Sequence, residues 1–286
     1  MATMIQFTFI VNKLRDIERD AQSLLSELDA RPLSARSLLL SFLLGSHPPD
    51  VSSARLVSFG RLFGLRDGTV RTALSRMVAA GEADVSDRRY RLAGRLLERQ
   101  REQDLGQQPP IDEWDGSWWT AIVVAGDRSM TERRRFRSAM SGARFGELRP
   151  DLWMRPANTH PPVAPPGVLV TAGPIVSGDD TSLTERLWDT ASIERISSRL
   201  GGVLDRLGDE LEVTTAPDDD GSVVLPLTFV VSAACVRHLR VEPQLPAALA
   251  DMPASRTLRS TYAEVNQRFR AALDVRLRAD AGSIAT

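Results

Sequence analysis

The chain of 286 residues contains one cysteine, one lysine and three histidines. A single cysteine, Cys235, excludes an intramolecular disulfide framework and a zinc site built from several cysteines, so we expect a reducing, cytoplasmic compartment. Because Lys13 is the one lysine, nearly all positive charge is carried by arginine, and the number of arginines says little about function. The positions of the arginines along the chain are the more useful signal.

We expect neither a leader peptide nor a membrane-spanning segment. Residues 1–15 hold a short apolar stretch, but no basic residue precedes it and no small-residue cleavage pattern follows. By sequence, no segment is long and apolar enough to span a bilayer. With a net charge of -1 and 42% hydrophobic residues, we expect a soluble globular protein of two or three domains, with no membrane partner.

Groups that could carry catalysis or hold a metal are few and scattered. His47 lies in a proline loop and His160 in a proline-rich linker, whereas Cys235 and His238 are three residues apart on an expected helix. The sequence places no third group beside that pair, as nucleophilic catalysis would require. We therefore expect no enzyme activity, no catalytic residue, no cofactor and no bound metal.

Serine caps and glycine stops mark a small helical domain near the N-terminus. Ser34 can cap an apolar helix, and Ser52 or Ser53 can cap a second helix that stops at Gly64. A third helix, over residues 67–80, follows after a turn of three or four residues. Its apolar residues recur at helical spacing: Val70, Ala73, Leu74, Met77 and Val78. Two helices joined so tightly predict a helix-turn-helix.

After the third helix the pattern changes to two short alternating runs, over 82–85 and 90–93. This change predicts a hairpin with Arg88 and Arg89 at its tip. Three helices followed by a hairpin predict a winged helix-turn-helix domain. A charged helix and a Gln/Pro linker then place the first domain boundary near residue 108.

The arginines concentrate in this domain. Between residues 61 and 101, ten arginines face five acidic residues, a local net charge of about +5 in a nearly neutral chain. On the third helix, the face opposite the apolar stripe carries arginine, threonine and serine and no acid after Asp67, a mixture suited to base edges and phosphates. A helical hairpin with a solvated basic face is the alternative. The predicted DNA-binding residues are Thr69, Arg71, Thr72, Ser75 and Arg76 on this helix, Arg88 and Arg89 at the hairpin tip, and Arg36 and Ser53 near helix starts.

Beyond the linker, apolar runs and helical patterns predict an α+β chain. Residues 109–215 have the pattern of a strand over 118–125, a helix, a second strand over 148–156, a third strand and one or two helices, which suggests a ferredoxin-like middle domain. Residues 216–286 begin in an acidic turn and hold two helices around "EPQLP", a C-terminal helical domain. An N-terminal helical extension over 1–31, which either docks on the chain or mediates dimerisation, precedes the winged helix domain over 32–108.

Two features of the middle domain leave other functions open. Arg133, Arg134, Arg135 and Arg137 form a dense run, which is either a solvated helix face or a phosphate site for a nucleotide-like ligand. Asp127 closes the first strand, where a metal-dependent nuclease could hold a metal ligand, although a lone carboxylate is a weak site. An interaction scaffold without DNA binding is a third possibility.

The order of these segments resembles the PaaX family of transcriptional regulators over nearly the whole chain after Ala30. The similarity rests on "LLLSFLLG", "FGLRDGTVRTALSRMVAAG", "EWDGSWWTAIVV", "RFGELRPDLWMRP", "LWDTASIERI" and the "EPQLP" spacer. It implies a winged helix, a ferredoxin-like middle domain and a helical C-terminal domain. It also implies a homodimeric repressor of catabolic genes that binds double-stranded DNA at a palindromic operator and is released by an acyl-CoA, such as phenylacetyl-CoA.

Overall fold

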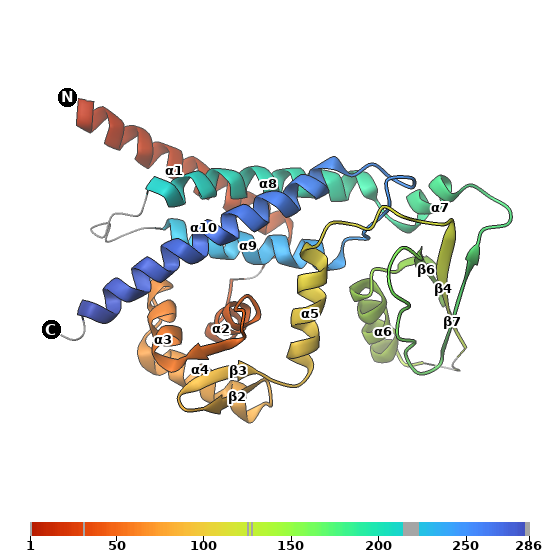
Figure 1. Cartoon of the computed structure of the whole chain (residues 1–286), viewed down its shortest axis with the longest axis horizontal. Coiled ribbons are helices and arrows are strands. Elements are labelled where there is room, and N and C mark those ends of the chain that lie inside the picture. The colour runs from red at the N-terminus through yellow and green to blue at the C-terminus, as the bar shows by residue number, and fades with distance from the viewer. Residues whose placement is uncertain (1, 31, 125, 127, 214–222, 284–286) are drawn as a thin grey trace. The chain divides into compact units, whose positions relative to one another are not determined.

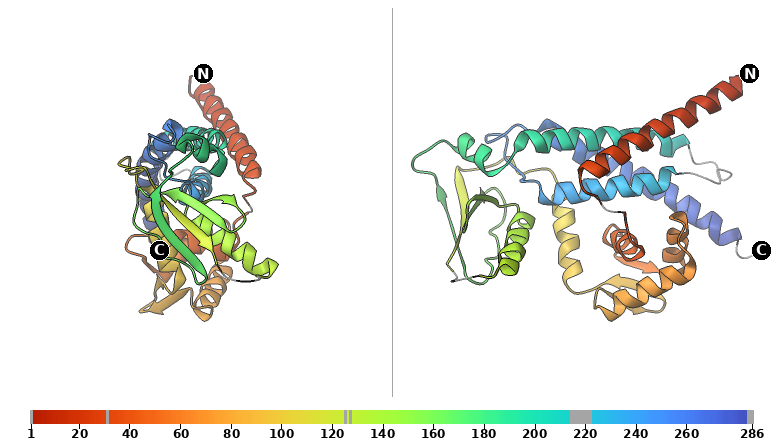
Figure 2. Two further views of the ribbon diagram at one scale, coloured as in Figure 1. Left: turned by 90° about the vertical axis from the view of Figure 1, so that its right-hand side faces the viewer. Right: turned by 180° about the vertical axis from the view of Figure 1, so that it is seen from behind.

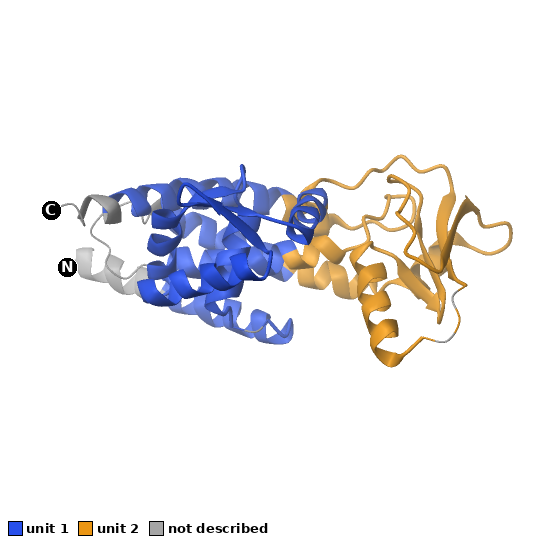
Figure 3. Ribbon diagram, turned by 90° about the horizontal axis from the view of Figure 1, so that it is seen from below, with its two compact units in different colours: residues 1–105, 199–236, 260–286 blue, residues 106–198, 237–259 orange. Residues whose placement is uncertain are grey.

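The computed structural model of the chain describes residues 2–30, 32–124, 126, 128–213 and 223–283. Helices dominate, and the strands form two small antiparallel sheets, so the expected α+β class is confirmed (Figure 1). By their internal contacts the residues form two compact units (Figure 3). Unit 1 comprises residues 1–105, 199–236 and 260–286, and unit 2 comprises residues 106–198 and 237–259.

The N-terminal part of unit 1 holds three helices and a three-stranded sheet in the order β1-β3-β2. The Ser34 hydroxyl accepts a hydrogen bond from the Ser37 amide, and Ser52, not Ser53, caps the next helix. Gly64 takes a φ of 70°, as glycines just beyond a helix end commonly do. In chain order, the elements are α2 (Ala35–Leu44), β1 (Asp50–Ser52), α3 (Ser53–Leu62), α4 (Asp67–Ala79), β2 (Ala83–Ser86) and β3 (Arg89–Leu92).

The other helices that contribute to this unit are long. Four of them are divided, with part of each helix in unit 1 and the rest in unit 2. Phenylalanines from α2, α3 and two of these long helices pack together in the core of unit 1. The rings of Phe42 and Phe59 are 4.0 Å apart and nearly parallel, and Phe229 meets Phe59 edge-on at 5.0 Å. The long helices are α1 (Ala2–Glu27), α5 (Arg95–Gln107), α8 (Thr190–Val213), α9 (Val224–Val241) and α10 (Pro253–Ser283).

The described side chains of α1 dock against the rest of unit 1, with α1 and α8 side by side in Figures 1 and 2. Ile17 and Ala21 are buried on one face of α1. Lys13 Nζ lies 2.6 Å from a carboxylate oxygen of Glu210 on α8, and Arg206 donates to Asp20 at 2.8 Å. Docking is therefore the role that the structure shows for this extension, and a role in dimerisation stays a prediction.

Helix α9 departs from the prediction that no segment is long and apolar enough to span a bilayer. Among the described helices it alone is long and apolar enough, by length and composition, to cross a membrane. Half of its residues are buried inside the chain, including Phe229 and Cys235. Because these side chains pack in the core of unit 1, we attribute the apolar character of α9 to core packing.

Unit 2 contains a four-stranded antiparallel sheet in the order β5-β6-β4-β7. Its elements are β4 (Ser117–Val123), α6 (Met130–Gly142), β5 (Gly146–Arg149), β6 (Leu152–Pro156), β7 (Val168–Pro174) and α7 (Asp180–Leu187). Strands β4 and β5 run in the same direction with β6 between them, so β4, α6 and β5 form a split βαβ unit. The single strand expected over 148–156 is wrong, because Asp151, with a φ of 70°, turns the chain into the hairpin β5-β6.

Two parts of the expected architecture stay predictions. The connection from β6 to β7 is a proline-rich loop without a described helix, whereas a complete ferredoxin-like pattern has a second helix there. The four consecutive domain ranges also differ from the two units, which combine segments distant in sequence. The boundary expected near residue 108 lies close to the change of unit after residue 105, and the acidic turn expected at 215–222 lies outside the described residues.

Candidate nucleic-acid interface

Four residues, 63–66, connect α3 to α4, and the two helices approach each other closely at Gly60. A Cβ atom at Gly60 would lie only 2.5 Å from Cγ2 of Val70. Val70 is fully buried, so its side chain has little room to move away. The glycine therefore permits the close helix crossing that positions α4 on α3.

Helix α4 separates an apolar face from a polar face, as its residue spacing predicts. The buried residues are Val70, Ala73, Leu74 and Met77. The five residues predicted to contact DNA from this helix are all exposed: Thr69, Arg71, Thr72, Ser75 and Arg76. No side chain caps the N-terminus of α4. The structure therefore brings these five residues together on one exposed helix face.

The acidic residue at the start of α4, Asp67, is neutralised within the chain. Arg61 donates from Nε and Nη2 to the two carboxylate oxygens of Asp67 at 2.8 and 2.6 Å. These hydrogen bonds hold the pKa of Asp67 below its ordinary value. Arg71 lies 4.0 Å from the same carboxylate and keeps 69% of its side chain exposed. Because Arg61 already compensates Asp67, the guanidinium of Arg71 is accessible to an outside partner.

The hairpin β2-β3 turns at Asp87 and Arg88, whose φ angles of 51° and 59° fit a two-residue type I′ turn. The carbonyl of Arg88 accepts a hydrogen bond from the Ser53 amide at 2.8 Å, which attaches the hairpin tip to the start of α3. The side chain of Arg88 is exposed and forms no ion pair with the described residues. The hairpin tip therefore presents one available cation beside the helical pair.

Arg89, the other arginine expected at the tip, is held by Asp50. Its Nε donates to Asp50 Oδ1 at 2.9 Å and its Nη2 donates to the Asp50 carbonyl at 3.0 Å. Arg91 donates to the other carboxylate oxygen at 3.1 Å. Partial burial acts to raise the pKa of Asp50, but the hydrogen bonds and charges of Arg91 and Arg89 outweigh it and lower that pKa. A phosphate would have to share Arg89 with Asp50.

Two residues predicted to contact phosphate are engaged within the fold. Arg36 donates from Nε to Glu82 at 2.8 Å and from Nη2 to the second carboxylate oxygen, and the Glu82 side chain is only 8% exposed. The hydrogen bond to Glu82 raises the pKa of Arg36. The Ser53 amide already donates to the carbonyl of Arg88 at 2.8 Å, so this amide is not available to a phosphate, and a contact from the Ser53 side chain stays a prediction. Both residues stabilise the local structure.

Sequence reasoning passed over two further arginines at this surface. Arg66 immediately precedes α4, and Arg95 begins α5 directly after the hairpin. Both are exposed, and neither forms an ion pair within the described part of the chain. A position just before a helix start is a signal that could have identified Arg66, because helix N-termini attract anions.

The structure shows no assembled catalytic or metal site among the described residues. No group of three or more histidines, cysteines or acidic residues in these ranges could hold a metal ion, and Asp127 lies outside them. Ser197 meets His238 at 2.8 Å, but Ser197 is fully buried and burial lowers the pKa of His238. Burial also raises the pKa of the Cys235 thiol. Neither the Ser197 hydroxyl nor the Cys235 thiol is an accessible nucleophile, because both residues are fully buried.

The arginine run of the middle segment lies on α6. Its four members are exposed: Arg133, Arg134, Arg135 and Arg137. Arg137 donates to Glu147 at 3.0 Å, and the helix begins in a capping box of Ser129 and Glu132. These contacts agree with a solvated helix face.

Comparisons with known proteins point to the segment that carries the candidate interface. A family model described as PaaX-like protein matches residues 34–96, from the cap of α2 to the start of α5. Among solved structures, the chain is similar to "Uncharacterized protein Rv0674 from Mycobacterium tuberculosis", with 35% sequence identity and a TM-score of 0.62. That similarity covers 85% of this chain and 98% of the other. No curated protein matches the chain.

Proposed function

The chain belongs to the PaaX-like family, a membership consistent with a transcription regulator, and from this premise we propose that it is a sequence-specific DNA-binding repressor. The single observation that carries this proposal is the exposed face of α4. It holds two arginines among hydroxyl side chains, its one acidic neighbour is compensated, and it lies within the matched residues 34–96.

In this proposal α4 is the recognition helix of a winged helix-turn-helix and enters the major groove. Arg71 and Arg76 are long enough to reach guanine edges, with which arginine pairs through two hydrogen bonds. Thr69, Thr72 and Ser75 are short and contact phosphates or thymine methyl groups. Arg88 at the hairpin tip contacts the phosphate backbone beside the groove.

The proposal includes two further partners and a location. A homodimer would place two copies of α4 on the half-sites of a palindromic operator, as two-fold symmetric proteins do on two-fold symmetric DNA. An acyl-CoA would release the operator and so permit transcription of catabolic genes. Repression of this kind takes place in the cytoplasm, where the chromosome is accessible.

The experiment is a fluorescence anisotropy titration of labelled operator duplex, obtained by selection from genomic fragments, at several salt concentrations. Arg71→Ala should weaken specific binding by about 1–3 kcal/mol, the usual cost of losing one two-bonded base contact. Arg88→Ala should weaken binding to every duplex and reduce the slope of log K against log salt by about 1, because one phosphate contact is lost.

Arg19→Ala is the matched control, because Arg19 is an exposed arginine on α1 whose side-chain partner is the neighbouring Asp16. It should bind the operator as the wild type does. Far-ultraviolet circular dichroism and unfolding midpoints establish that each variant is folded. Folded Arg71→Ala and Arg88→Ala proteins that bind with wild-type affinity and wild-type salt slope would contradict the proposal.

A further inference from the structure

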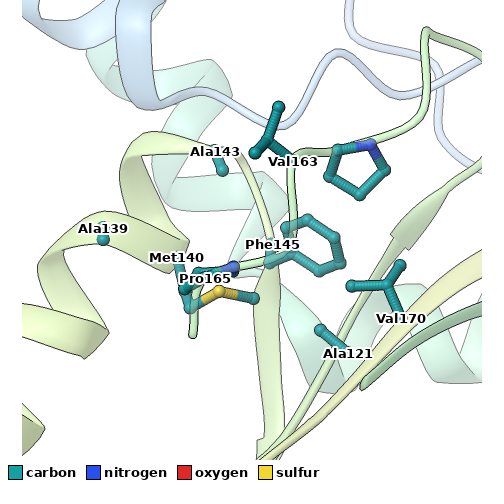
Figure 4. Close-up of a pocket in the computed structure, with 9 residues that line it drawn as sticks. Ala121, Ala139, Met140, Ala143, Phe145, Val163, Pro165 and Val170 are labelled. Carbon is teal, nitrogen blue, oxygen red and sulfur yellow. The ribbon is translucent and has the colours of Figure 1, made fainter. Parts of the chain in front are cut away.

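Unit 2 contains an apolar cavity of about 160 Å³ between α6 and the sheet (Figure 4). Ala121 and Val170 line it from the sheet, Ala139 lines it from α6, and Phe145 follows that helix. Val163, in the loop between β6 and β7, is 94% exposed, so this wall of the cavity lies at the surface. An apolar cavity of about 150 Å³ accepts a benzene molecule. The cavity is therefore suited to an apolar group of about one ring.

Arg155, on β6, lies beside the cavity. Its guanidinium carbon is 5.1 Å from the centre of the Phe145 ring, and its Nη1 donates to the carbonyl of Ala143 at 3.4 Å. Phe145 and Ala143 both line the cavity. Burial, together with the nearby charge of Arg144, lowers the pKa of Arg155 to about 10. Both influences disfavour its positive charge, which an anion placed here would stabilise.

Nη2 of Arg155 donates to the carbonyl of His160 at 2.9 Å, but three other donors in this region have no acceptor among the described residues. Arg155 Nε and the Thr159 hydroxyl are buried without a hydrogen-bond partner, and both residues line a separate indentation of about 10 Å³ that shares no lining residue with the cavity. The indole N–H of Trp119, the cross-strand neighbour of Arg155, is also buried without a hydrogen-bond partner. Buried donors of this kind favour a ligand that supplies acceptor oxygens, because leaving them unpaired destabilises the fold.

We propose that unit 2 binds a small organic anion, with an apolar body of about one ring in the cavity and an anionic head group, a carboxylate or a phosphate, beside the guanidinium of Arg155. The apolar lining excludes a fully polar ligand, and the arginine selects for negative charge. The inference goes beyond the proposed function, since the binding concerns unit 2 alone and does not require this anion to be the acyl-CoA that releases the operator.

Calorimetric titration of the full chain with three probes tests the proposal: benzoate, the neutral benzyl alcohol and inorganic phosphate. Benzoate should bind most tightly. Arg155→Met should weaken benzoate at least about tenfold, because a charge-assisted hydrogen bond is lost, and should leave benzyl alcohol within about twofold. Ala139→Leu, which fills the cavity from α6, should weaken both organic probes.

Arg149→Met and Ser138→Leu are the matched controls, because both residues are exposed near the site without lining the cavity, and both variants should bind as the wild type does. Competition by phosphate against benzoate would support a shared anion position. Absence of saturable benzoate binding, or unchanged affinity in Arg155→Met or Ala139→Leu, would overturn the proposal. Benzoate binding by a protein that binds no DNA would support the site and contradict only the proposed function.

Discussion

Replacing Gly60 by alanine adds one methyl group at the crossing of α3 and α4. The new Cβ would lie 2.5 Å from Cγ2 of Val70, well inside van der Waals contact. Val70 is fully buried, and a β-branched side chain has few other rotamers in a helix. The helices must therefore move apart or the Val70 side chain must leave its preferred rotamer.

Two effects of opposite sign decide the free energy of unfolding of Gly60→Ala. Alanine is favoured over glycine in a helix interior by about 1 kcal/mol. Overpacking a well-packed core costs about 1–3 kcal/mol. Gly68→Ala, in α4, is a suitable reference because no atom lies within 4 Å of its added Cβ, so only the helix preference acts there. The Gly60 variant should thus be less stable than the Gly68 variant by about 1–3 kcal/mol, the overpacking term alone.

Urea unfolding followed by circular dichroism measures both variants. Val70→Ala should be less destabilising in the Gly60→Ala background than in the wild type, because it removes the clashing methyl groups, and the double-mutant cycle reports that coupling. A Gly60→Ala protein as stable as Gly68→Ala, with no coupling to Val70, would refute the claim that this glycine sets the helix crossing.

Two further predictions concern ion pairs of the same domain. Glu82→Gln should lower the unfolding free energy by about 1–3 kcal/mol, because the buried Glu82 loses its charge-assisted bonds to Arg36; denaturant titration measures this, and an unchanged midpoint would contradict it. Arg61 lowers the pKa of Asp67 in the folded chain, so the stabilisation is complete above the unfolded-state pKa and is lost as the pH falls through the folded-state pKa. The stability difference between wild type and Asp67→Asn should therefore vanish at acid pH, and a difference independent of pH would argue against this pairing.

Local features of the interface were predictable from the sequence. The cap at Ser34, the left-handed Gly64 and the buried stripe that begins at Val70 depend on neighbours within one or two helical turns. Periodicity and capping preferences contain this information because the contacts are short in sequence. The exposed face of α4 follows from the same pattern.

Long-range pairing was not predictable in this way. Arg36 meets Glu82 across 46 residues, and Arg89 meets Asp50 across 39. A charge pattern shows that these residues are basic or acidic but does not show which of them become partners. The position of Arg36 near a helix start and of Arg89 at the hairpin tip therefore predicts contact with phosphate and gives no sign of the carboxylates that hold them. The turn at Asp151 has a local signal, the Pro150-Asp151 pair, because both residue types favour turns, and this signal argues against one continuous strand over 148–156.

The central claim, that the exposed face of α4 recognises DNA sequence, is tested most directly by selecting bound sequences from a pool of randomised duplexes. Wild-type protein should enrich a palindromic consensus. Arg71→Ala should enrich the same consensus with the preference relaxed at one base pair in each half-site, because a single base contact is removed. No enrichment by the wild type, or an identical consensus from Arg71→Ala, would contradict the account.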